Sequence, residues 1–199
     1  MKSTLFSILI LYAFSVQAQQ LETVVQRGHN AAIKAVVFSN DGKYLFTGSR
    51  DKTIKLWEIS TGRELRSFYG HESTINDLAL SPDGKHLLSS SADKTAKLWD
   101  IRTGKLIKTF AGHDEILTSV AFHPNGTAII TAGYDNEAIL WDISTLKPKI
   151  RLKVNPDKGL GYGVNTSFSP DGKYIVIGND NRTANIFDFE TGDLQKEIK

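Results

Sequence analysis

The sequence of 199 residues contains no cysteine and only one methionine. The chain can therefore form no disulfide bond, no thiolate metal site and no cysteine-linked lipid anchor, so its stability has to come from packing. After residue 20 no apolar segment approaches the roughly 20 residues that a membrane-spanning helix needs, and no run of five or six like charges suggests a disordered tail. The formal net charge is only +2, which argues against a nucleic-acid partner.

The first eighteen residues differ from the rest of the chain. Lys2 gives a positive start, Leu5 to Val16 form an apolar run of twelve residues, and Ala18 closes a stretch of small residues that suits a signal peptidase. A membrane anchor is the alternative, but twelve residues are too few to cross a bilayer. We predict a signal peptide at 1–18, a mature chain from Gln19 to Lys199, and export to a periplasmic or extracellular site.

An internal repeat organises the remainder of the chain. The three tryptophans, Trp57, Trp99 and Trp141, lie 42 residues apart each time, and the Gly-His pairs that begin at Gly28, Gly70 and Gly112 have the same spacing. A fourth, weaker copy ends at Phe187-Asp188. Each copy also carries a turn such as Ser81-Pro82-Asp83-Gly84, in which proline presets one dihedral angle and glycine accepts a positive φ.

Short β-branched and aromatic runs within each copy predict strands and not helices. In the first copy the expected strands are 33–38, 44–49, 53–58 and 64–69, with turn residues between them. The same pattern recurs, so we expect four antiparallel strands per copy. The last strand of the fourth copy is expected at 193–198.

With Gly-His at one end of each copy and Trp-Asp or Trp-Glu at the other, the chain resembles the WD40-repeat family from about Leu21 to its C-terminus. The resemblance implies an all-β fold, a β-propeller segment over 19–199 built from four-stranded antiparallel blades. Four blades are expected, at about 28–69, 70–111, 112–153 and 154–199, with an extra N-terminal strand at 21–27.

In this family such an N-terminal strand commonly completes the last blade and closes the ring. Here the fourth copy already has its own outer strand, so the strand at 21–27 has no blade to complete. A seven-bladed ring would need about 294 residues, within the four to eight blades of the architecture. We therefore expect an incomplete ring, closed by further blades of a longer protein or by self-association with another chain.

Each of the first three copies carries a histidine, a serine or threonine, an aspartate and a tryptophan at constant spacing. The resemblance implies that these residues form a structural hydrogen-bond chain in each blade. The chains are His29, Thr47, Asp51 and Trp57; His71, Ser89, Asp93 and Trp99; and His113, Thr131, Asp135 and Trp141. Their donors and acceptors can all be satisfied mutually. A catalytic triad is the alternative, but a nucleophile would need exposure and would hardly be needed three times.

The fourth copy departs from this pattern. Ile177 replaces the hydroxyl, Asn181 replaces the aspartate, Phe187 replaces the tryptophan, and Gly159 stands where ungapped counting puts the histidine. We therefore expect no polar chain in that blade. Its extra residues fall near 154–163.

Two other residue patterns could indicate a binding site. The glycines between Gly159 and Gly163 suggest a phosphate-binding turn, but they open no helix, so an ordinary loop is the other interpretation. Asp51, Asp93, Asp135 and His123 suggest a metal site, but residues repeated once per blade are dispersed around a ring. We expect no cofactor and no metal.

The function predicted is therefore a non-catalytic, exported scaffold that binds a protein or peptide with the loops of one face. The candidate contact residues vary from copy to copy beside the constant framework. They are Lys34, Asn76 and Thr118, five residues after each Gly-His histidine, and Arg50, Tyr134 and Asp180, just before the turn aspartate or its substitute. The alternative is a regulatory propeller of a larger exported enzyme, for example a caspase-like peptidase, whose catalytic domain is not in this chain.

Overall fold

Each repeat folds into an antiparallel four-stranded sheet, called a blade here, in the computed structural model, which describes residues 28–153, 165–179 and 182–199. Blade 1 contains β1 (Ile33–Phe38), β2 (Tyr44–Ser49), β3 (Ile54–Glu58) and β4 (Arg63–Phe68). Blade 2 contains β5 (Ile75–Leu80), β6 (His86–Ser91), β7 (Thr95–Asp100) and β8 (Leu106–Ala111). Blade 3 contains β9 (Leu117–Phe122), β10 (Ala128–Gly133), β11 (Glu137–Asp142) and β12 (Lys147–Lys153). Blade 4 contains β13 (Asn165–Phe168), β14 (Tyr174–Gly178), β15 (Ala184–Asp188) and β16 (Leu194–Ile198).

Turn chemistry places the strand ends. In the first turn of blade 1 the N–H of Gly42 donates to the carbonyl of Ser39 over 2.9 Å, and Gly42 has φ +68°, a conformation that glycine adopts without steric cost. The Asp41 carboxylate accepts hydrogen bonds from the Ser39 hydroxyl and the Lys43 N–H. Blades 2 and 4 repeat this turn with Ser-Pro-Asp-Gly, so the turn predicted from sequence fixes where β2, β6 and β14 begin.

The four sheets confirm the predicted all-β fold of four-stranded antiparallel blades. Strand positions differ from the predicted ones by one residue at most in blade 1, where β3 begins at Ile54 and β4 spans Arg63–Phe68. The predicted signal peptide at 1–18, the strand at 21–27 and the insertion at 154–163 lie outside the described residues.

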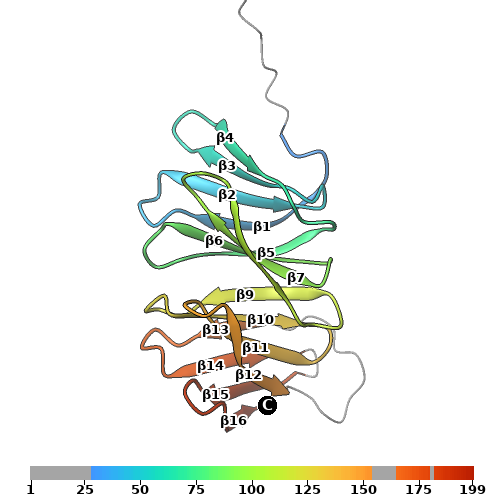
Figure 1. Ribbon diagram of the computed structural model, residues 1–199, viewed down its shortest axis with the longest axis vertical. Helices are drawn as coiled ribbons and strands as arrows, with labels where there is room; N and C mark the ends of the chain where they lie inside the picture. The colour runs from blue at the N-terminus through green and yellow to red at the C-terminus, as the bar shows by residue number, and fades with distance from the viewer. Residues whose placement is uncertain (1–27, 154–164, 180–181) are drawn as a thin grey trace, which may run out of the picture.

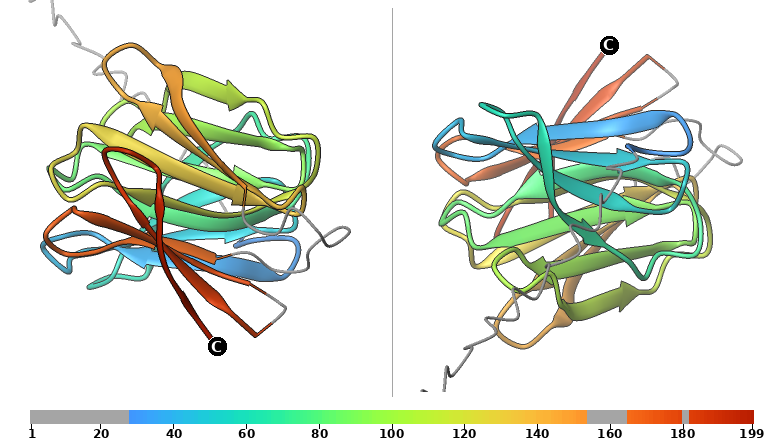
Figure 2. Two further views of the ribbon diagram at one scale, coloured as in Figure 1. Left: turned by 90° about the horizontal axis from the view of Figure 1, so that it is seen from below. Right: turned by 90° about the horizontal axis from the view of Figure 1, so that it is seen from above.

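The blades follow one another in sequence order, with β1–β4 at one end of the molecule and β13–β16 at the other (Figure 1). The innermost strands β1, β5, β9 and β13 contact each other in that order. Each sheet is strongly twisted, so its outer strand turns away from its inner strand (Figure 2). The described blades thus form an open arc and not a closed ring.

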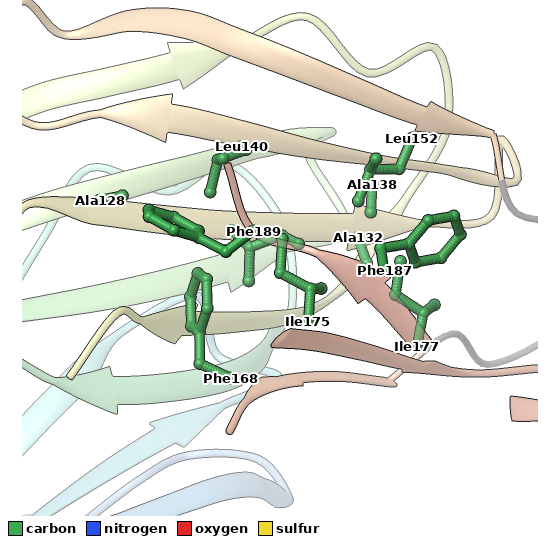
Figure 3. Packing of buried hydrophobic residues seen from close by; sticks show 11 residues of the cluster. Ala128, Ala132, Ala138, Leu140, Leu152, Phe168, Ile175, Ile177, Phe187 and Phe189 are labelled. Atoms are coloured by element: carbon green, nitrogen blue, oxygen red, sulfur yellow. The ribbon is translucent and has the colours of Figure 1, made fainter. Parts of the chain in front are cut away.

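The hydrophobic core lies between successive blades. Between blades 1 and 2, the rings of Phe68 and Trp99 meet edge to face at 6.0 Å, and both side chains are only 1% exposed. Leu140 and Leu152 of blade 3 belong to one buried cluster with Phe187 and the other apolar residues of blade 4 (Figure 3). Burial of this apolar surface stabilises each blade against the next.

We expect the cost of truncating a leucine to depend on whether a neighbouring blade covers it. Leu152 is 2% exposed between blades 3 and 4, whereas Leu106 on the outer strand of blade 2 is 45% exposed. Leu152→Ala should lower the free energy of unfolding by about 2 to 5 kcal/mol, because it leaves a cavity. Leu106→Ala should cost less than about 1 kcal/mol. Urea denaturation measures both, and equal losses would contradict the assignment of the core.

Candidate functional site at the loop ends of the blades

A four-residue hydrogen-bond chain runs through blade 2 toward its loop end. The indole N–H of Trp99 on β7 donates to the hydroxyl of Ser89 on β6 over 2.9 Å. Ser89 Oγ lies 2.8 Å from His71 Nε2, and His71 Nδ1 lies 2.7 Å from the Asp93 carboxylate. Since a carboxylate only accepts, Nδ1 carries the proton and Nε2 accepts from the serine, so every polar group has a partner.

Blades 1 and 3 contain the same kind of hydrogen-bond chain. In blade 3 Trp141 donates to the Thr131 hydroxyl over 2.9 Å, and His113 lies 2.8 Å from both Thr131 Oγ1 and Asp135 Oδ2. The corresponding distances in blade 1, among Trp57, Thr47, His29 and Asp51, are 2.8, 2.6 and 2.9 Å. The structure therefore brings together the four residues that the sequence pattern groups in each of these blades.

The aspartate of each chain also holds the loop that enters the blade. The carboxylates of Asp51, Asp93 and Asp135 accept the backbone N–H of Asn30, Glu72 and Asp114, respectively, at 2.9 to 3.0 Å. Each carboxylate thus links the loop before the first strand of its blade to the turn between the second and third strands. A buried, fully paired network of this kind makes the loop end rigid.

Burial and hydrogen bonding set the charge states within the hydrogen-bond chain of blade 2. Burial raises the pKa of Asp93, but hydrogen bonds from His71, from the Thr95 hydroxyl and from the Glu72 N–H outweigh it and hold the pKa well below its usual range. Burial lowers the pKa of His71 below its ordinary value despite the neighbouring carboxylate. At neutral pH blade 2 therefore contains a carboxylate bonded to a neutral imidazole.

Burial also argues against the catalytic interpretation of these residues. The hydroxyl residues Ser89 and Thr131 are fully buried, and Thr47 is 4% exposed. Each hydroxyl already accepts a hydrogen bond from a tryptophan and donates to a histidine. A nucleophile has to reach its substrate, so this geometry supports a structural role.

Blade 4 replaces the polar chain with apolar packing. Ile177 is fully buried and Phe187 is 5% exposed, and both belong to the core cluster shared with blade 3 (Figure 3). Gly159 and Asn181, the other two substitutions, lie outside the described residues. Isoleucine in place of the hydroxyl and phenylalanine in place of the indole remove one acceptor and one donor together, so these two positions leave no polar atom without a partner.

The loop ends combine a constant backbone with differing side chains. The backbone N–H groups of Arg50, Ala92 and Tyr134 each donate, over 2.9 Å, to the carbonyl of a residue in the loop before the first strand of the same blade. Arg50 is exposed and Tyr134 is half-buried. These three equivalent positions therefore present three different side chains on similarly fixed supports.

The remaining candidate contact residues differ in how far they are already engaged. Lys34 is exposed at the bulge in β1. Asn76, its equivalent in blade 2, donates from its amide to the Leu117 carbonyl of blade 3 over 2.6 Å, and the Thr118 hydroxyl lies 3.4 Å from the Ala132 carbonyl. Asn76 thus helps to hold blade 2 to blade 3. Asp180 lies outside the described residues.

Asp77 on β5 joins neighbouring blades, and the repeat pattern does not reveal this role. Its carboxylate accepts the Ser119 hydroxyl and the Val120 N–H, each over 3.0 Å, and Ser119 Oγ in turn accepts the Thr166 N–H over 3.2 Å. These bonds join the inner strands of blades 2, 3 and 4. Burial raises the pKa of Asp77 despite those hydrogen bonds. The equivalent residue of blade 1 is Ala35, so nothing at this position repeats.

A groove lies between blades 1 and 2 at the end opposite to Arg50 and Ala92. It has a volume of about 500 Å³ and lies beside the turns that precede β2 and β6. Its apolar and charged lining includes Tyr44, Leu80, Asp83, Arg66 and Arg102. Sequence reasoning did not find it, because the groove forms between two blades.

Aspartates that could suggest a metal site are each used within their own blade, as described above for Asp51, Asp93 and Asp135. Within 28–153, 165–179 and 182–199 no three histidine, aspartate or glutamate side chains are grouped to hold a metal ion. The same ranges contain no helix of the length and apolarity that crossing a membrane requires.

Removing one shared hydroxyl should destabilise blade 3. Thr131→Val keeps the side-chain shape but leaves the Trp141 N–H and the His113 imidazole without their partner. We expect a loss of about 1 to 3 kcal/mol in the free energy of unfolding. Thr61→Val, at an exposed turn position, should change it by less than about 0.5 kcal/mol. Chemical denaturation measures both free energies of unfolding. Equal values for the two variants would refute the stabilising role of the hydrogen-bond chain.

Hydrogen bonds outweigh burial at Asp51 and Asp135 as they do at Asp93, so the pKa of all three carboxyl groups lies below its usual value. This predicts a loss of stability in acid. A carboxyl group whose pKa is lower in the folded state stabilises the fold above its unfolded-state pKa of about 4, and this contribution disappears as the pH falls further. Asp93→Asn should therefore reduce the slope of unfolding free energy against pH below about pH 4, while Asp51 and Asp135 keep part of it. The exposed Asp114→Asn is the control, and an unchanged slope for Asp93→Asn would contradict the prediction.

Comparison with known proteins agrees with this architecture. A family model described as WD domain, G-beta repeat matches residues 20–58, 62–100, 104–142 and 161–188. Curated relatives include the Ribosome biogenesis protein BOP1 homologs of Drosophila erecta, Drosophila sechellia and Drosophila melanogaster, each 47% identical over 47 residues. That match covers 24% of this chain and 6% of each relative, little more than one repeat. On the four family-model matches, the chain belongs to the WD40-repeat family.

Proposed function

We propose that this protein is a scaffold that binds a protein or peptide partner across the loop ends of its blades. The observation that carries the proposal is the row formed by Arg50, Ala92 and Tyr134, where a fixed backbone presents different side chains. Rigid supports reduce the conformational entropy that binding costs. Membership of the WD40-repeat family, whose propellers typically bind proteins, supports the same conclusion.

The basic side chains at the loop end of blade 1 favour a partner with an acidic segment. Lys34, Arg50 and Lys52 are exposed together at the loop end of blade 1. The neighbouring Asp51 already accepts hydrogen bonds from His29, Asn30 and Thr53, so it offers little to an incoming ligand. Arginine and tyrosine are also among the side chains that most often anchor protein interfaces. We infer that an acidic segment lies over blade 1 and an apolar group over Tyr134.

We also infer that the protein is exported. The first eighteen residues carry the signal-peptide pattern described above, which supports a periplasmic or extracellular setting for the partner. The name of the Drosophila relatives is not transferred to this chain, because the matched segment is about one repeat in length.

Peptide selection tests the proposed face. A displayed library of random peptides is selected on the purified protein, and the affinity of a selected peptide is then measured for variants by fluorescence anisotropy. Arg50→Ala and Tyr134→Ala should each weaken binding about tenfold or more, as anchors of an interface do. Binding should also weaken as salt increases, because exposed charges are screened.

The control is Arg63→Ala, an exposed arginine at the opposite end of blade 1, which should leave the affinity unchanged. Selected peptides that bind the Arg50→Ala and Tyr134→Ala variants with full affinity would overturn the proposed face. Loss of binding in Arg102→Ala alone would move the site to the groove between blades 1 and 2.

A further inference from the structure

The groove between blades 1 and 2 has an equivalent between blades 2 and 3. The first groove has a volume of about 500 Å³ and the second of about 380 Å³. Each lies between the turn before the second strand of one blade and the same turn of the next blade. Ligand pockets typically have volumes of about 300 to 1,000 Å³, so both grooves have room for a side chain of a ligand.

Between blades 3 and 4 the chain fills the corresponding place with its own aromatic side chains. Three rings stand where the first groove has smaller side chains: His123, Phe168 and Phe189, in place of Ser39, Leu80 and Ile101. The ring centroids of His123 and Phe189 are 4.2 Å apart, and Phe168 meets His123 edge to face at 5.1 Å. Phe189 is 8% exposed and belongs to the core cluster of blades 3 and 4 (Figure 3). An aromatic ring therefore fits at this position between two blades of this chain.

A charged pair accompanies the Phe189 ring. Lys149 Nζ lies 4.8 Å from the centroid of Phe189 and donates to the Glu190 carboxylate over 3.0 Å. The dipeptide Phe189-Glu190 thus places a ring between the blades and a carboxylate beside a cation. In blade 2 the equivalent dipeptide is Ile101-Arg102. The first groove therefore has a smaller apolar side chain in place of the ring and a cation in place of the carboxylate.

A second arginine is held at the wall of the first groove. Arg66 on β4 donates from Nη1 to the Thr103 carbonyl of blade 2 over 2.7 Å. Its stem passes Gly104, where an added Cβ would lie 2.9 Å from Arg66 Cδ. The guanidinium keeps further N–H donors, and its plane can hold a carboxylate or stack on an aromatic ring. Arg66 is thus positioned before any ligand arrives.

The aspartates beside the groove are each balanced by a lysine. Asp41 and Asp83 line the groove, and each accepts a hydrogen bond from the serine of its own turn. Lys43 Nζ lies 3.8 Å from the Asp41 carboxylate, and Lys85 Nζ lies 3.6 Å from that of Asp83. The two arginines therefore give this region a net positive charge, which favours a ligand with a carboxylate.

The second groove lacks the features that suit such a ligand. Leu146, which lines it, stands in place of Gly104. Ser144 stands in place of Arg102, so the position beside the groove carries no charge. The first groove is therefore both the larger and the better matched to an acidic group.

We propose that the groove between blades 1 and 2 binds a partner segment in which an aromatic residue is followed by an acidic one. The ring enters beside Ile101, as Phe189 does between blades 3 and 4, and the carboxylate pairs with Arg102. The Arg66 guanidinium supplies a cation for the ring, as Lys149 does for Phe189. The groove lies at the end of the blades opposite to Arg50, so this site is separate from the loop-end site and does not rest on that proposal.

Isothermal titration calorimetry with unlabelled peptides tests the proposal. The probe is a hexapeptide with a central Phe-Glu pair between glycine and serine residues, and it should bind. Alanine in place of the phenylalanine should weaken binding about tenfold or more, as loss of an anchor does. Glutamine in place of the glutamate should weaken it about two- to fivefold, as loss of an exposed ion pair does. Arg102→Ala should weaken binding of the Phe-Glu peptide by the same factor and leave that of the Phe-Gln peptide unchanged.

A variant that fills the groove from within gives a second test. Ile101→Phe copies the residue that the chain has at Phe189, so it should fold and should weaken binding of the Phe-Glu peptide about tenfold or more, because its own ring takes the place of the ligand. Ile143→Phe, at the equivalent position of the second groove, is the matched control and should bind with full affinity. Circular dichroism checks that both variants fold.

Several outcomes would overturn the proposal. They are no binding of the Phe-Glu peptide, equal affinity for the peptide with alanine, and full affinity of the Ile101→Phe or the Arg102→Ala variant for the Phe-Glu peptide. Arg50→Ala and Tyr134→Ala should bind this peptide unchanged, so failure of the loop-end proposal is recognised separately. Loss of binding in those two variants would place the peptide at the loop ends and would also overturn the groove site.

Discussion

The packing of one blade against the next is the constraint on which the rest of the structure depends. A four-stranded sheet has two faces, and an apolar face has to be buried against another layer. Trp99 shows how the repeat meets this demand, because its ring packs on Phe68 of blade 1 while its N–H bonds to Ser89 within blade 2. Packing between blades and hydrogen bonding within a blade therefore share one side chain. Where the described residues provide no neighbouring blade, as at Val36 and Ile198, the same positions are exposed.

The polar chains convert this packing into a rigid support for function. In blades 2 and 3 the hydrogen-bond chain begins at a tryptophan in the interblade core. It ends at an aspartate such as Asp93, which holds the entering loop through the Glu72 N–H. The residues of the hydrogen-bond chain repeat in blades 1 to 3, where they form the same support each time. Residues at the loop ends, such as Arg50 and Tyr134, differ because nothing in the support specifies them. In blade 4 Ile177 and Phe187 replace two members of the hydrogen-bond chain and pack in the apolar core shared with blade 3.

Sequence periodicity predicted what lies within one repeat better than what lies between repeats. Turn residues such as Gly42 have local conformational effects, so strand positions in blade 1 were predicted to within one residue. Which side chains reach a neighbouring blade depends on the angle between sheets, which no spacing encodes. The hydrogen bond from Asn76 to blade 3 was therefore not predicted, and its contact with a partner stays a prediction. Asp77 was missed because its equivalents, Ala35 and Ser119, share no chemistry with it.

Hydrogen exchange, followed segment by segment, tests most directly the claim that each blade depends on its neighbours. In dilute solution the account predicts slow exchange in β6, β7 and β10, which are covered on both sides, and faster exchange in β1 and β14. The reason is that the described residues cover β1 and β14 on one side only. Equal exchange in all four blades would contradict the account.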